Sequence, residues 1–265
     1  MKLLVTDIDD TLSVGDYVSD EVSDACASLV KNGWDIMIAS GRSFFTAKNH
    51  IKAAHATQPA ILYDGARTMS LDGLEIESVT MSPSLVSEIL KFLWTVPAEI
   101  QIACDEFILC RASDAETSRF YRKSGVSVRY IDSPSFIEEA SFDCPIYRCA
   151  LWMTPDVFAR VENSVREAFG ERVEIIPGGA EFLDILEKGV SKGSAFDRFL
   201  SRLSVRPETI VVAGDHLNDL EILRRADIAV APKNAHPLVL EAADFIMPTA
   251  REGGIKVLVE KVLAE

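Results

Sequence analysis

The sequence predicts an α/β protein in which a Rossmann-like core domain, built on a parallel sheet, is interrupted by an inserted α+β domain. Short apolar runs of strand type alternate with helical patterns at both ends of the chain, and this alternation is typical of parallel sheets. The segment between these ends, about 120 residues, is far longer than an ordinary connection and should fold on its own. We therefore expect one domain from residues 1–64 and 187–265 and the other from residues 65–186.

The N-terminal part of the expected core domain contains three strand-like runs separated by helical patterns. Leu3-Leu4-Val5 is a short apolar run that ends in acidic residues, as a buried strand does where its carboxyl end reaches the surface. Ser19 can then cap a helix that ends at Gly33, because apolar residues recur between them at helical spacing. Two more runs of the buried type follow at residues 36–39 and 60–63, and we expect both in the same sheet.

The C-terminal part repeats this alternation. Ser191 can cap a helix with an apolar face, and the strand-like run at residues 210–213 follows it. Shorter runs at residues 228–230 and 245–247 are typical of edge strands, and the spacing of apolar residues between 255 and 262 predicts a terminal helix.

The middle segment has a different pattern. Strand-like pairs around Gly73 and around Asp105-Glu106 predict hairpins, while residues 83–95 and 155–169 have helical spacing. These elements favour an α+β domain with an antiparallel sheet.

Composition narrows the class of function. Hydrophobic residues make up 48% of the chain and charged residues 26%, as in an ordinary globular protein. The formal net charge of −14 argues against binding to nucleic acid or to anionic membranes, because both depend on basic patches. The charge is explained either by solubility alone or by acidic clusters that hold a cation.

The cysteines and the N-terminus favour a cytoplasmic location. The five cysteines form no CxxC pair, and their odd number does not suggest a disulfide framework, so we expect reduced core residues. The N-terminal apolar run is broken by Asp7 and is too short for a signal peptide or a membrane span.

Asp7, Asp9 and Asp10 place three carboxylates within four residues at the end of a predicted buried strand. Like charges repel there, and a Mg²⁺ ion would compensate, since it prefers carboxylate oxygens together with water and phosphate oxygens. Asp7 and Asp9 are two residues apart and can point to the same side, so that one can attack while the other handles a proton. The alternative is a solvated acidic turn.

A second acidic cluster, Gly214-Asp215-His216-Leu217-Asn218-Asp219, follows another predicted strand. Asp215 lies at a strand exit, as Asp7 does, and would face it if the two strands are neighbours, because ligands bind at the carboxyl ends of parallel strands. Asp219 could instead merely interact with the dipole of a following helix.

Two further segments suggest a phosphate site. Ser40-Gly41-Arg42 follows a predicted strand and offers a hydroxyl and backbone N–H groups to phosphate oxygens, although a Ser-Gly pair is more often a simple turn. Lys192 lies in the first turn of a predicted helix, where its charge opposes the helix dipole. A bound anion would remove that conflict; a solvated surface lysine is the alternative.

Taken in order, these segments resemble the four motifs of the haloacid dehalogenase superfamily. The resemblance is carried by Val5-Thr6-Asp7-Ile8-Asp9-Asp10-Thr11-Leu12, Ser40-Gly41-Arg42, Lys192, and Gly214-Asp215 with Asn218-Asp219. The large insertion between the second and third motifs resembles the α/β cap of the Cof-type and sucrose-phosphatase-like branches. Residues 232–237 and 252–255 resemble the C-terminal segments of these branches.

The resemblance implies a role for each motif residue. Asp7 would be the nucleophile and a magnesium ligand, and Asp9 the general acid and base, with its backbone carbonyl on the metal. Asp215 would complete the metal site, and Asp219 would support it indirectly. The phosphoryl group would be held by Ser40, Gly41 and Lys192, with Asn218 orienting phosphate or lysine.

Two positions depart from the family pattern. Asp10 replaces the commonest glycine, and Asp64 stands where Cof-type chains usually have asparagine before Gly65. Asp64 and Gly65 therefore become candidates for hinge or substrate contacts. Arg42 could reach substrate, but a structural ion pair is an equal alternative.

The favoured function is hydrolysis of small phosphorylated metabolites, such as sugar phosphates or phosphoglycolate-like acids, by a magnesium-dependent phosphatase. The alternatives are a phosphomutase or phosphotransferase on the same core and a non-catalytic phospho-aspartate module. Specificity should come from charged residues of the cap: Glu99, Arg111, Arg119, Arg122, Arg129 and Arg148. The arginines among them suggest anionic substrate groups beyond the phosphate, or equally an ordinary charged surface. The sequence does not predict an oligomeric state.

Overall fold

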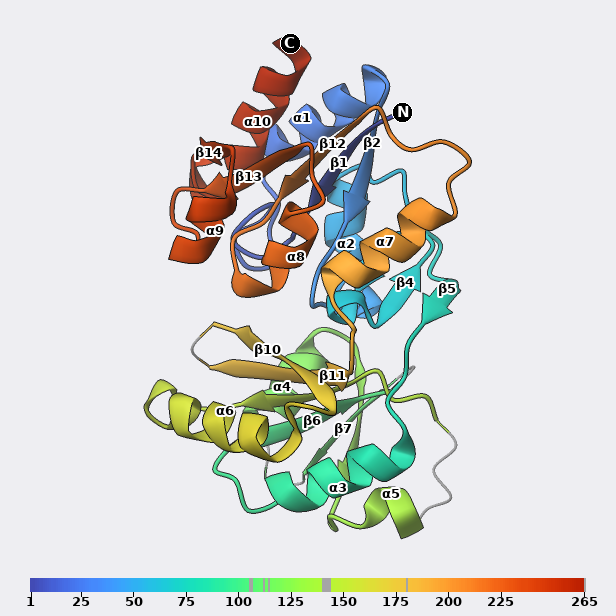
Figure 1. Ribbon diagram of the computed structural model, residues 1–265, viewed down its shortest axis with the longest axis vertical. Helices are drawn as coiled ribbons and strands as arrows, with labels where there is room; N and C mark the ends of the chain where they lie inside the picture. Colours follow the sequence, from blue (N-terminus) through green and yellow to red (C-terminus); the bar gives the residue numbers. More distant parts are fainter. Residues whose placement is uncertain (105–106, 112, 114, 140–143, 180, 265) are drawn as a thin grey trace. The chain divides into compact units, whose positions relative to one another are not determined.

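The computed structural model describes residues 1–104, 107–111, 113, 115–139, 144–179 and 181–264 (Figure 1). The chain divides into two compact units, one formed by Met1–Glu77 with Ser191–Glu265 and the other by Ser78–Val190. We refer to them as the core unit and the cap unit. Both junctions lie later in the chain than the expected boundaries at residues 64 and 187, because the pairing of short strands keeps residues 67–77 with the core unit and residues 182–187 with the cap unit.

The core unit is built on a parallel sheet of five strands. These are β1 (Lys2–Thr6), β2 (Trp34–Ile38), β12 (Thr209–Ala213), β13 (Ile228–Pro232) and β14 (Phe245–Met247). Their order is β14-β13-β12-β1-β2, and every neighbouring pair is parallel. The expected α/β architecture is therefore confirmed, with strands from both ends of the chain in one sheet.

Helices cover both faces of this sheet. Successive side chains of a strand point to opposite faces, so Leu4 of β1 packs in one hydrophobic cluster while Leu3 and Val5 pack in another. The first cluster is covered by α1 (Asp20–Lys31), α2 (Phe44–Ala53) and α10 (Gly254–Ala264). The second is covered by α7 (Lys192–Ser201), α8 (Leu220–Leu223) and α9 (Pro237–Ala242). Two short 3₁₀ helices, η2 (Leu217–Asp219) and η3 (Ala250–Glu252), lie in the connections.

The third expected strand does not continue the main sheet. β3 (Ala60–Leu62) forms a separate three-stranded sheet with β4 (Arg67–Met69) and β5 (Glu75–Ser78), and the link to the main sheet is an isolated bridge between Ala39 and Ile61. The expected hairpin around Gly73 is confirmed, since β4 and β5 flank it. The 3₁₀ helix η1 (Tyr63–Gly65) turns the chain from β3 into β4.

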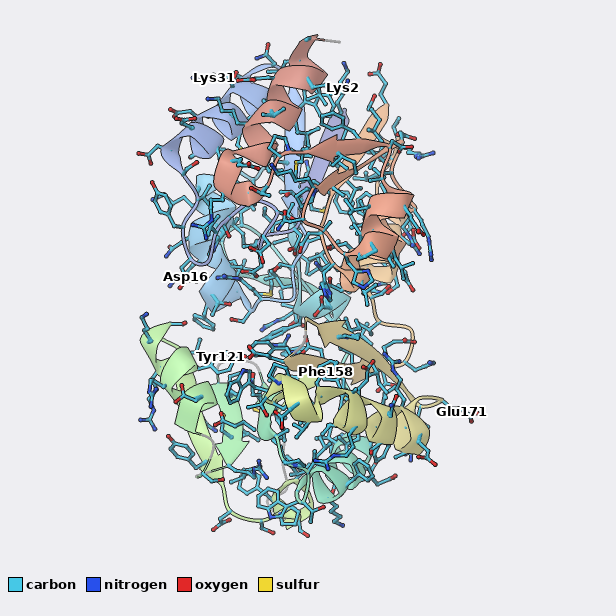
Figure 2. The ribbon with its side chains drawn as sticks, turned by 90° about the vertical axis from the view of Figure 1, so that its left-hand side faces the viewer. Lys2, Asp16, Lys31, Tyr121, Phe158 and Glu171 are labelled. Atoms are coloured by element: carbon cyan, nitrogen blue, oxygen red, sulfur yellow. The ribbon has the colours of Figure 1, made fainter. Side chains whose placement is uncertain are left out.

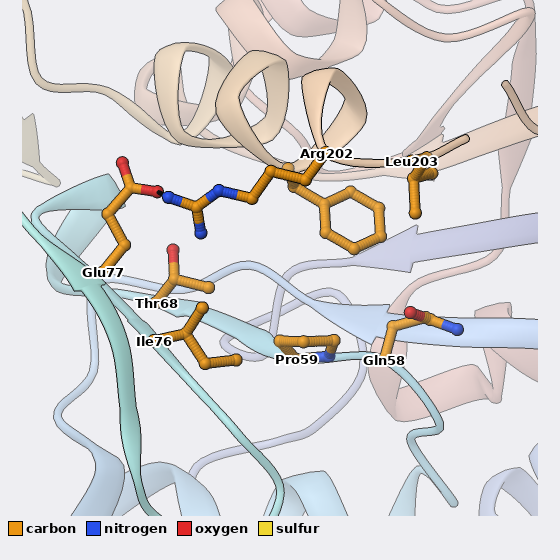
Figure 3. Close-up of a pocket in the computed structure, with 8 residues that line it drawn as sticks. Gln58, Pro59, Thr68, Ile76, Glu77, Arg202 and Leu203 are labelled. Carbon is orange, nitrogen blue, oxygen red and sulfur yellow. Dashed lines mark ion pairs between the residues drawn. The ribbon is translucent and has the colours of Figure 1, made fainter. Parts of the chain in front are cut away.

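The small sheet is tied to α7 within the core unit. Glu77 of β5 forms ion pairs with Arg198 of α7 and with Arg202, which caps its C-terminus. A shallow pocket lies beside this contact (Figure 3), and it is lined by Gln58, Pro59, Thr68, Ile76, Glu77, Phe199, Arg202 and Leu203. The connection through η1 and β5 therefore belongs structurally to the core unit.

The cap unit contains a six-stranded sheet with the order β10-β11-β9-β6-β7-β8. Its strands are β6 (Glu99–Ala103), β7 (Phe107–Arg111), β8 (Ser127–Ile131), β9 (Arg148–Trp152), β10 (Val173–Gly178) and β11 (Phe182–Glu187). The sheet is antiparallel, as expected, except that β7 and β8 run parallel because α4 (Ala115–Lys123) crosses between them. Of the second expected hairpin, Asp105 and Glu106 lie outside the described residues, while the flanking β6 and β7 pair antiparallel.

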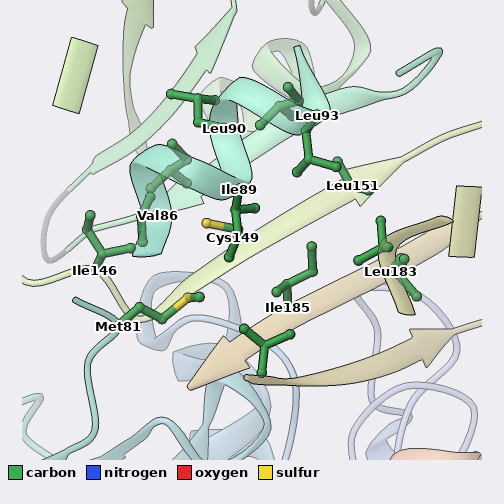
Figure 4. Packing of buried hydrophobic residues seen from close by; sticks show 14 of the residues in the cluster. Met81, Val86, Ile89, Leu90, Leu93, Ile146, Cys149, Leu151, Leu183 and Ile185 are labelled. Atoms are coloured by element: carbon green, nitrogen blue, oxygen red, sulfur yellow. The ribbon is translucent and has the colours of Figure 1, made fainter. Parts of the chain in front are cut away.

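One face of the cap sheet packs against helices to form the core of this unit (Figure 4). The helices are α3 (Pro83–Leu93) and α6 (Pro155–Phe169), both expected from their periodicity, with the short α5 (Phe136–Glu139) at one end. Ile89 and Leu93 of α3 lie beside Cys149 and Leu151 of β9 in this cluster.

Two expectations from composition can be compared with the structure. The five cysteines, Cys26, Cys104, Cys110, Cys144 and Cys149, are free thiols. Within the described ranges, no helix combines the length and apolar character that crossing a lipid bilayer requires.

Gly65 provides a stability test of the contact between η1 and α7. Its φ is +103°, and an added Cβ would lie 2.1 Å from the backbone oxygen of Ser191. We expect Gly65→Ala to lower the free energy of unfolding by about 3 kcal/mol or more, measured by urea unfolding followed by circular dichroism.

Gly33 is a matched control. It also has a positive φ, +82°, but nothing lies within 4 Å of an added Cβ. Gly33→Ala should therefore cost only the strain of the left-handed backbone, about 1 to 2 kcal/mol. If Gly65→Ala and Gly33→Ala lost the same free energy of unfolding, this would contradict the close contact between η1 and the start of α7.

Candidate active site

Two carboxylates leave the same edge of the core sheet. Asp7 follows β1 and Asp215 follows β12, and these strands are parallel neighbours. The backbone N–H of Asp7 continues the ladder by donating to the carbonyl of Ala213 at 3.0 Å. Because the carboxyl ends of parallel strands meet at one edge, Asp7, Asp215 and Asp219 come together, with one oxygen of each within 4.8 Å of the others.

Lys192 joins this cluster from the first turn of α7. Ser191 caps that helix, accepting a hydrogen bond from the N–H of Ser194. The Nζ atom of Lys192 lies 2.7 Å from Asp7 Oδ1 and 2.7 Å from Asp219 Oδ1. The lysine side chain is fully buried, so the ion pairs compensate for its loss of water. The structure therefore excludes one of the two alternatives for Lys192, that of a solvated surface lysine.

The electrostatics of the cluster follow from burial. Burial alone would lower the pKa of Lys192, but the carboxylates of Asp219, Asp7 and Asp64 together raise it well above its ordinary value. Burial raises the pKa of Asp7 in spite of the opposing effect of Lys192. Burial, with a contribution from Asp219, raises the pKa of Asp215 to about 7. The site therefore holds more negative charge than its lysine balances.

Asp219 also closes the loop that carries Asp215. Its Oδ2 accepts hydrogen bonds from the backbone N–H groups of Asp215 at 3.0 Å and His216 at 3.1 Å. A Cβ at Gly214 would lie 2.5 Å from the carboxyl carbon of Asp219, so the loop requires glycine there. Asp219 thus contacts Lys192 directly and also shapes the turn, which is more than an interaction with a helix dipole.

Asp9 lies apart from this cluster. β1 ends at Thr6, so strand alternation does not extend to Asp9, and its half-exposed carboxylate binds Arg42. The guanidinium donates to both carboxylate oxygens, at 2.6 and 2.9 Å. Arg42 also pairs with Asp16, whose side chain lies at the surface of the core unit (Figure 2). Of the two alternatives for Arg42, a substrate contact and a structural ion pair, the structure therefore shows the ion pair.

The segment Ser40-Gly41-Arg42 forms a tight turn beside η1. The side chain of Ser40 is buried, and its Oγ accepts a hydrogen bond from the N–H of Arg42 at 3.3 Å. The carboxylate of Asp64 lies against Gly41, where an added Cβ would be 2.8 Å from Asp64 Oδ2. Asp64 Oδ1 in turn accepts a hydrogen bond from Asn218 Nδ2 at 2.8 Å.

Two contacts were not predicted from the sequence. Thr11 Oγ1 donates to Asp215 Oδ1 at 3.0 Å, which joins the first and last motif segments. Thr11 stands in the first acidic motif, but nothing in its spacing distinguishes it from a residue of a turn. The bond between Asp64 and Asn218 depends on η1, whose geometry the sequence did not reveal.

The six charged cap residues singled out from the sequence have partners within the cap unit. Arg148 pairs with Asp184 at 2.9 Å, and Arg119 with Glu116 at 2.9 Å. Arg122 and Arg129 lie over aromatic rings, and Arg111 donates to backbone carbonyls. The Glu99 carboxylate accepts from the N–H of Glu116. These contacts give each of the six residues a structural role that does not depend on a substrate.

Comparison with known proteins connects this geometry to a family. A family model described as haloacid dehalogenase-like hydrolase matches residues 4–258. A putative bifunctional phosphatase/peptidyl-prolyl cis-trans isomerase of Streptococcus pyogenes is 25% identical over an alignment of 277 positions, which covers 99% of this chain and 54% of that protein. The chain thus spans about half the length of that relative.

Other relatives match over nearly their whole length. The 5-amino-6-(5-phospho-D-ribitylamino)uracil phosphatase of Escherichia coli is 21% identical over an alignment of 271 positions, which covers 99% of this chain and 96% of that protein. Among solved structures, a sugar phosphatase of haloacid dehalogenase subclass IIB has a TM-score of 0.83 at 22% identity, with 99% of both chains covered. This likeness shows a shared fold with a core and a cap.

The raised pKa of Asp215 generates a prediction on stability. Because this pKa is about 7 in the folded protein and 3.8 ordinarily, the protonated carboxyl stabilises the fold. That stabilisation is complete below a pH of about 4 and is lost as the pH rises through about 7. In EDTA, the free energy of unfolding of the wild type should therefore fall over this range more steeply than that of Asp215→Asn.

Urea unfolding at a series of pH values measures both slopes. Asp72→Asn removes an exposed carboxylate of the same unit and should follow the wild type. If the free energy of unfolding changed with pH in the same way for the wild type and for Asp215→Asn, this would contradict the raised pKa of Asp215.

Proposed function

This chain belongs to the haloacid dehalogenase-like hydrolases and is a phosphatase of the Cof type, and we propose that it hydrolyses small phosphorylated metabolites with magnesium, through an aspartyl-phosphate on Asp7. The observation that carries the proposal is the buried contact of Lys192 with Asp7 and Asp219 beside Asp215. A nucleophilic carboxylate, a cation for the phosphoryl oxygens and a set of metal ligands are then within reach of one another.

The residues of the cluster fit a magnesium ion. Asp7, Asp215 and Asp219 offer carboxylate oxygens, the donors that this ion prefers, and Lys192 balances only part of their charge. Asp7 and Asp215 would hold the ion, with the backbone carbonyl of Asp9, while Asp219 supports the site through the Asp215 loop and Lys192. Bound there, magnesium would neutralise negative charge on the phosphoryl group.

In the first step, a carboxylate oxygen of Asp7 attacks phosphorus, and the bond from phosphorus to the ester oxygen breaks. Lys192, Ser40 and the N–H groups at Gly41 would hold the phosphoryl oxygens in line, and Asn218 would orient Lys192. Asp9 would give its proton to the leaving alcohol.

In the second step, water attacks the phosphorus of the aspartyl-phosphate. Asp9, now a carboxylate, would take the proton of that water, and the bond from phosphorus to Asp7 breaks to release phosphate. Because Asp9 is half-exposed and bonded to Arg42, it would exchange this partner for the reacting groups in each step.

The cap unit would select the substrate and exclude water from the reaction. Relatives named for a ribitylaminouracil phosphate and for sugar phosphates support a phosphorylated polyol or sugar as the substrate class. Phosphoglycolate-like acids are the other candidates to include in a panel.

One prediction of the proposed function concerns Asp7. We expect phosphate release from p-nitrophenyl phosphate and from a panel of sugar and acid phosphates that needs magnesium, stops with EDTA and is absent in Asp7→Asn. Removing the nucleophile should leave no covalent route, and circular dichroism would verify that the variant folds. Wild-type protein that releases no phosphate from any compound would refute the proposal.

Another prediction of the proposed function concerns Asp9. Asp9→Asn should slow the first turnover of an alkyl phosphate by about 100- to 10,000-fold, because an alkoxide leaves poorly without a proton. The loss should be smaller for p-nitrophenyl phosphate, whose leaving group needs no proton. Rapid-quench measurement of product release compares the two substrates.

Asp10→Asn is the matched control for Asp9. Asp10 is an adjacent exposed carboxylate to which we assign no role, and its φ of 54° is one that asparagine also tolerates. It should keep the wild-type preference between the two substrates. An equal loss on both substrates in Asp9→Asn would argue against a general acid.

A further inference from the structure

Asp64 is a buried carboxylate outside the roles assigned above. It lies in η1, directly after β3, with only 1% of its surface exposed. Its backbone is left-handed, with φ 51° and ψ 29°, a conformation that aspartate, asparagine and glycine tolerate better than other residues. Burying a carboxylate in this way is costly unless its oxygens are bound, so its contacts indicate what it does.

These contacts connect two motif segments. On one side, the Asp64 carboxylate lies against Gly41, and the backbone N–H of Asp64 donates to the carbonyl of Ser40 at 3.2 Å. On the other side, Asp64 Oδ1 accepts from Asn218 Nδ2 at 2.8 Å. One side chain thus links the proposed phosphate-binding turn to the loop of Asp215 and Asp219.

The hydrogen bond also fixes the orientation of the Asn218 amide. A carboxylate accepts hydrogen bonds and repels a carbonyl oxygen, so the amide nitrogen has to face Asp64 and the oxygen has to face elsewhere. That oxygen, Asn218 Oδ1, is buried and has no hydrogen-bond partner among the described residues. An asparagine at position 64 would present either end of its own amide and would not impose this orientation.

We propose that Asp64 is a positioning residue for the phosphatase reaction, which acts by holding Asn218 with its amide nitrogen on Asp64 and its carbonyl oxygen available to accept a hydrogen bond from the ammonium of Lys192. The inference rests on the proposed function for its kinetic consequence. It also explains why position 41 is glycine, because a side chain there would displace the carboxylate.

A double-mutant cycle tests whether Asp64 acts through Asn218. We expect Asp64→Asn to lower kcat/KM about tenfold in the wild-type background, and to have little further effect in Asn218→Ala, because the residue it orients is then absent. Asp72→Asn, which removes an exposed carboxylate of the same unit, should change neither background. The same loss in both backgrounds would overturn the proposal, since a merely structural role predicts that result.

A spectroscopic measurement tests the contact without any substrate. The side-chain amide signals of Asn218 are identified in ¹⁵N–¹H spectra as the pair missing in Asn218→Ala. They should shift in Asp64→Asn and stay in place in Asp72→Asn, and an unchanged pair in Asp64→Asn would overturn the contact. If Asp64→Asn does not fold, Asp64→Gly replaces it in both tests, because glycine also tolerates the left-handed backbone. Failure of the proposed function would appear separately, as wild-type protein without turnover.

Discussion

The rest of the core unit depends on one interaction, the pairing of the buried Lys192 ammonium with two carboxylates. A charge with no access to water is stable in a protein only when it is paired, and two carboxylates at 2.7 Å provide that pairing. Asp7 comes from the end of β1, Asp219 from η2 and Lys192 from the start of α7. The ion pairs therefore fix three segments relative to one another, and removing any partner would leave a buried charge uncompensated.

The order of the strands brings these residues together. β1 and β12 come from opposite ends of the chain but are parallel neighbours, so the residues that follow them meet at one edge of the sheet. The strand pattern was sufficient to predict this meeting for Asp7 and Asp215, because it needs only two strand ends in a parallel sheet. For Asp219 and Lys192 the local pattern left alternatives open, and the family resemblance placed them in the site. The helices α1, α3, α6 and α7 were predictable for a similar reason, since an apolar periodicity marks each of them.

The remaining features depend on contacts that no local pattern encodes. β3 has three residues, too few to show whether it continues the main sheet or starts another, and η1 after it is set by its contact with α7. α4 is short and mostly polar, so it lacks the run of apolar residues from which the other helices were predicted, and the parallel pairing of β7 with β8 was not predicted either. In the site, the bonds of Thr11 to Asp215 and of Asn218 to Asp64 join distant segments whose side-chain directions follow from the folded turns.

The different surroundings of Asp7 and Asp9 suit the different tasks that we propose for these two carboxylates. Asp7 is buried, so it needs Lys192 nearby to be ionised, as a nucleophile must be. Asp9 is half-exposed and can exchange protons with water, as an acid that becomes a base must do. If Asp9 leaves Arg42 to meet a substrate, the bonds of Arg42 to Asp16 and to the carbonyl of Thr46 keep the guanidinium in place. The arginine then remains positioned to receive Asp9 again after each turnover.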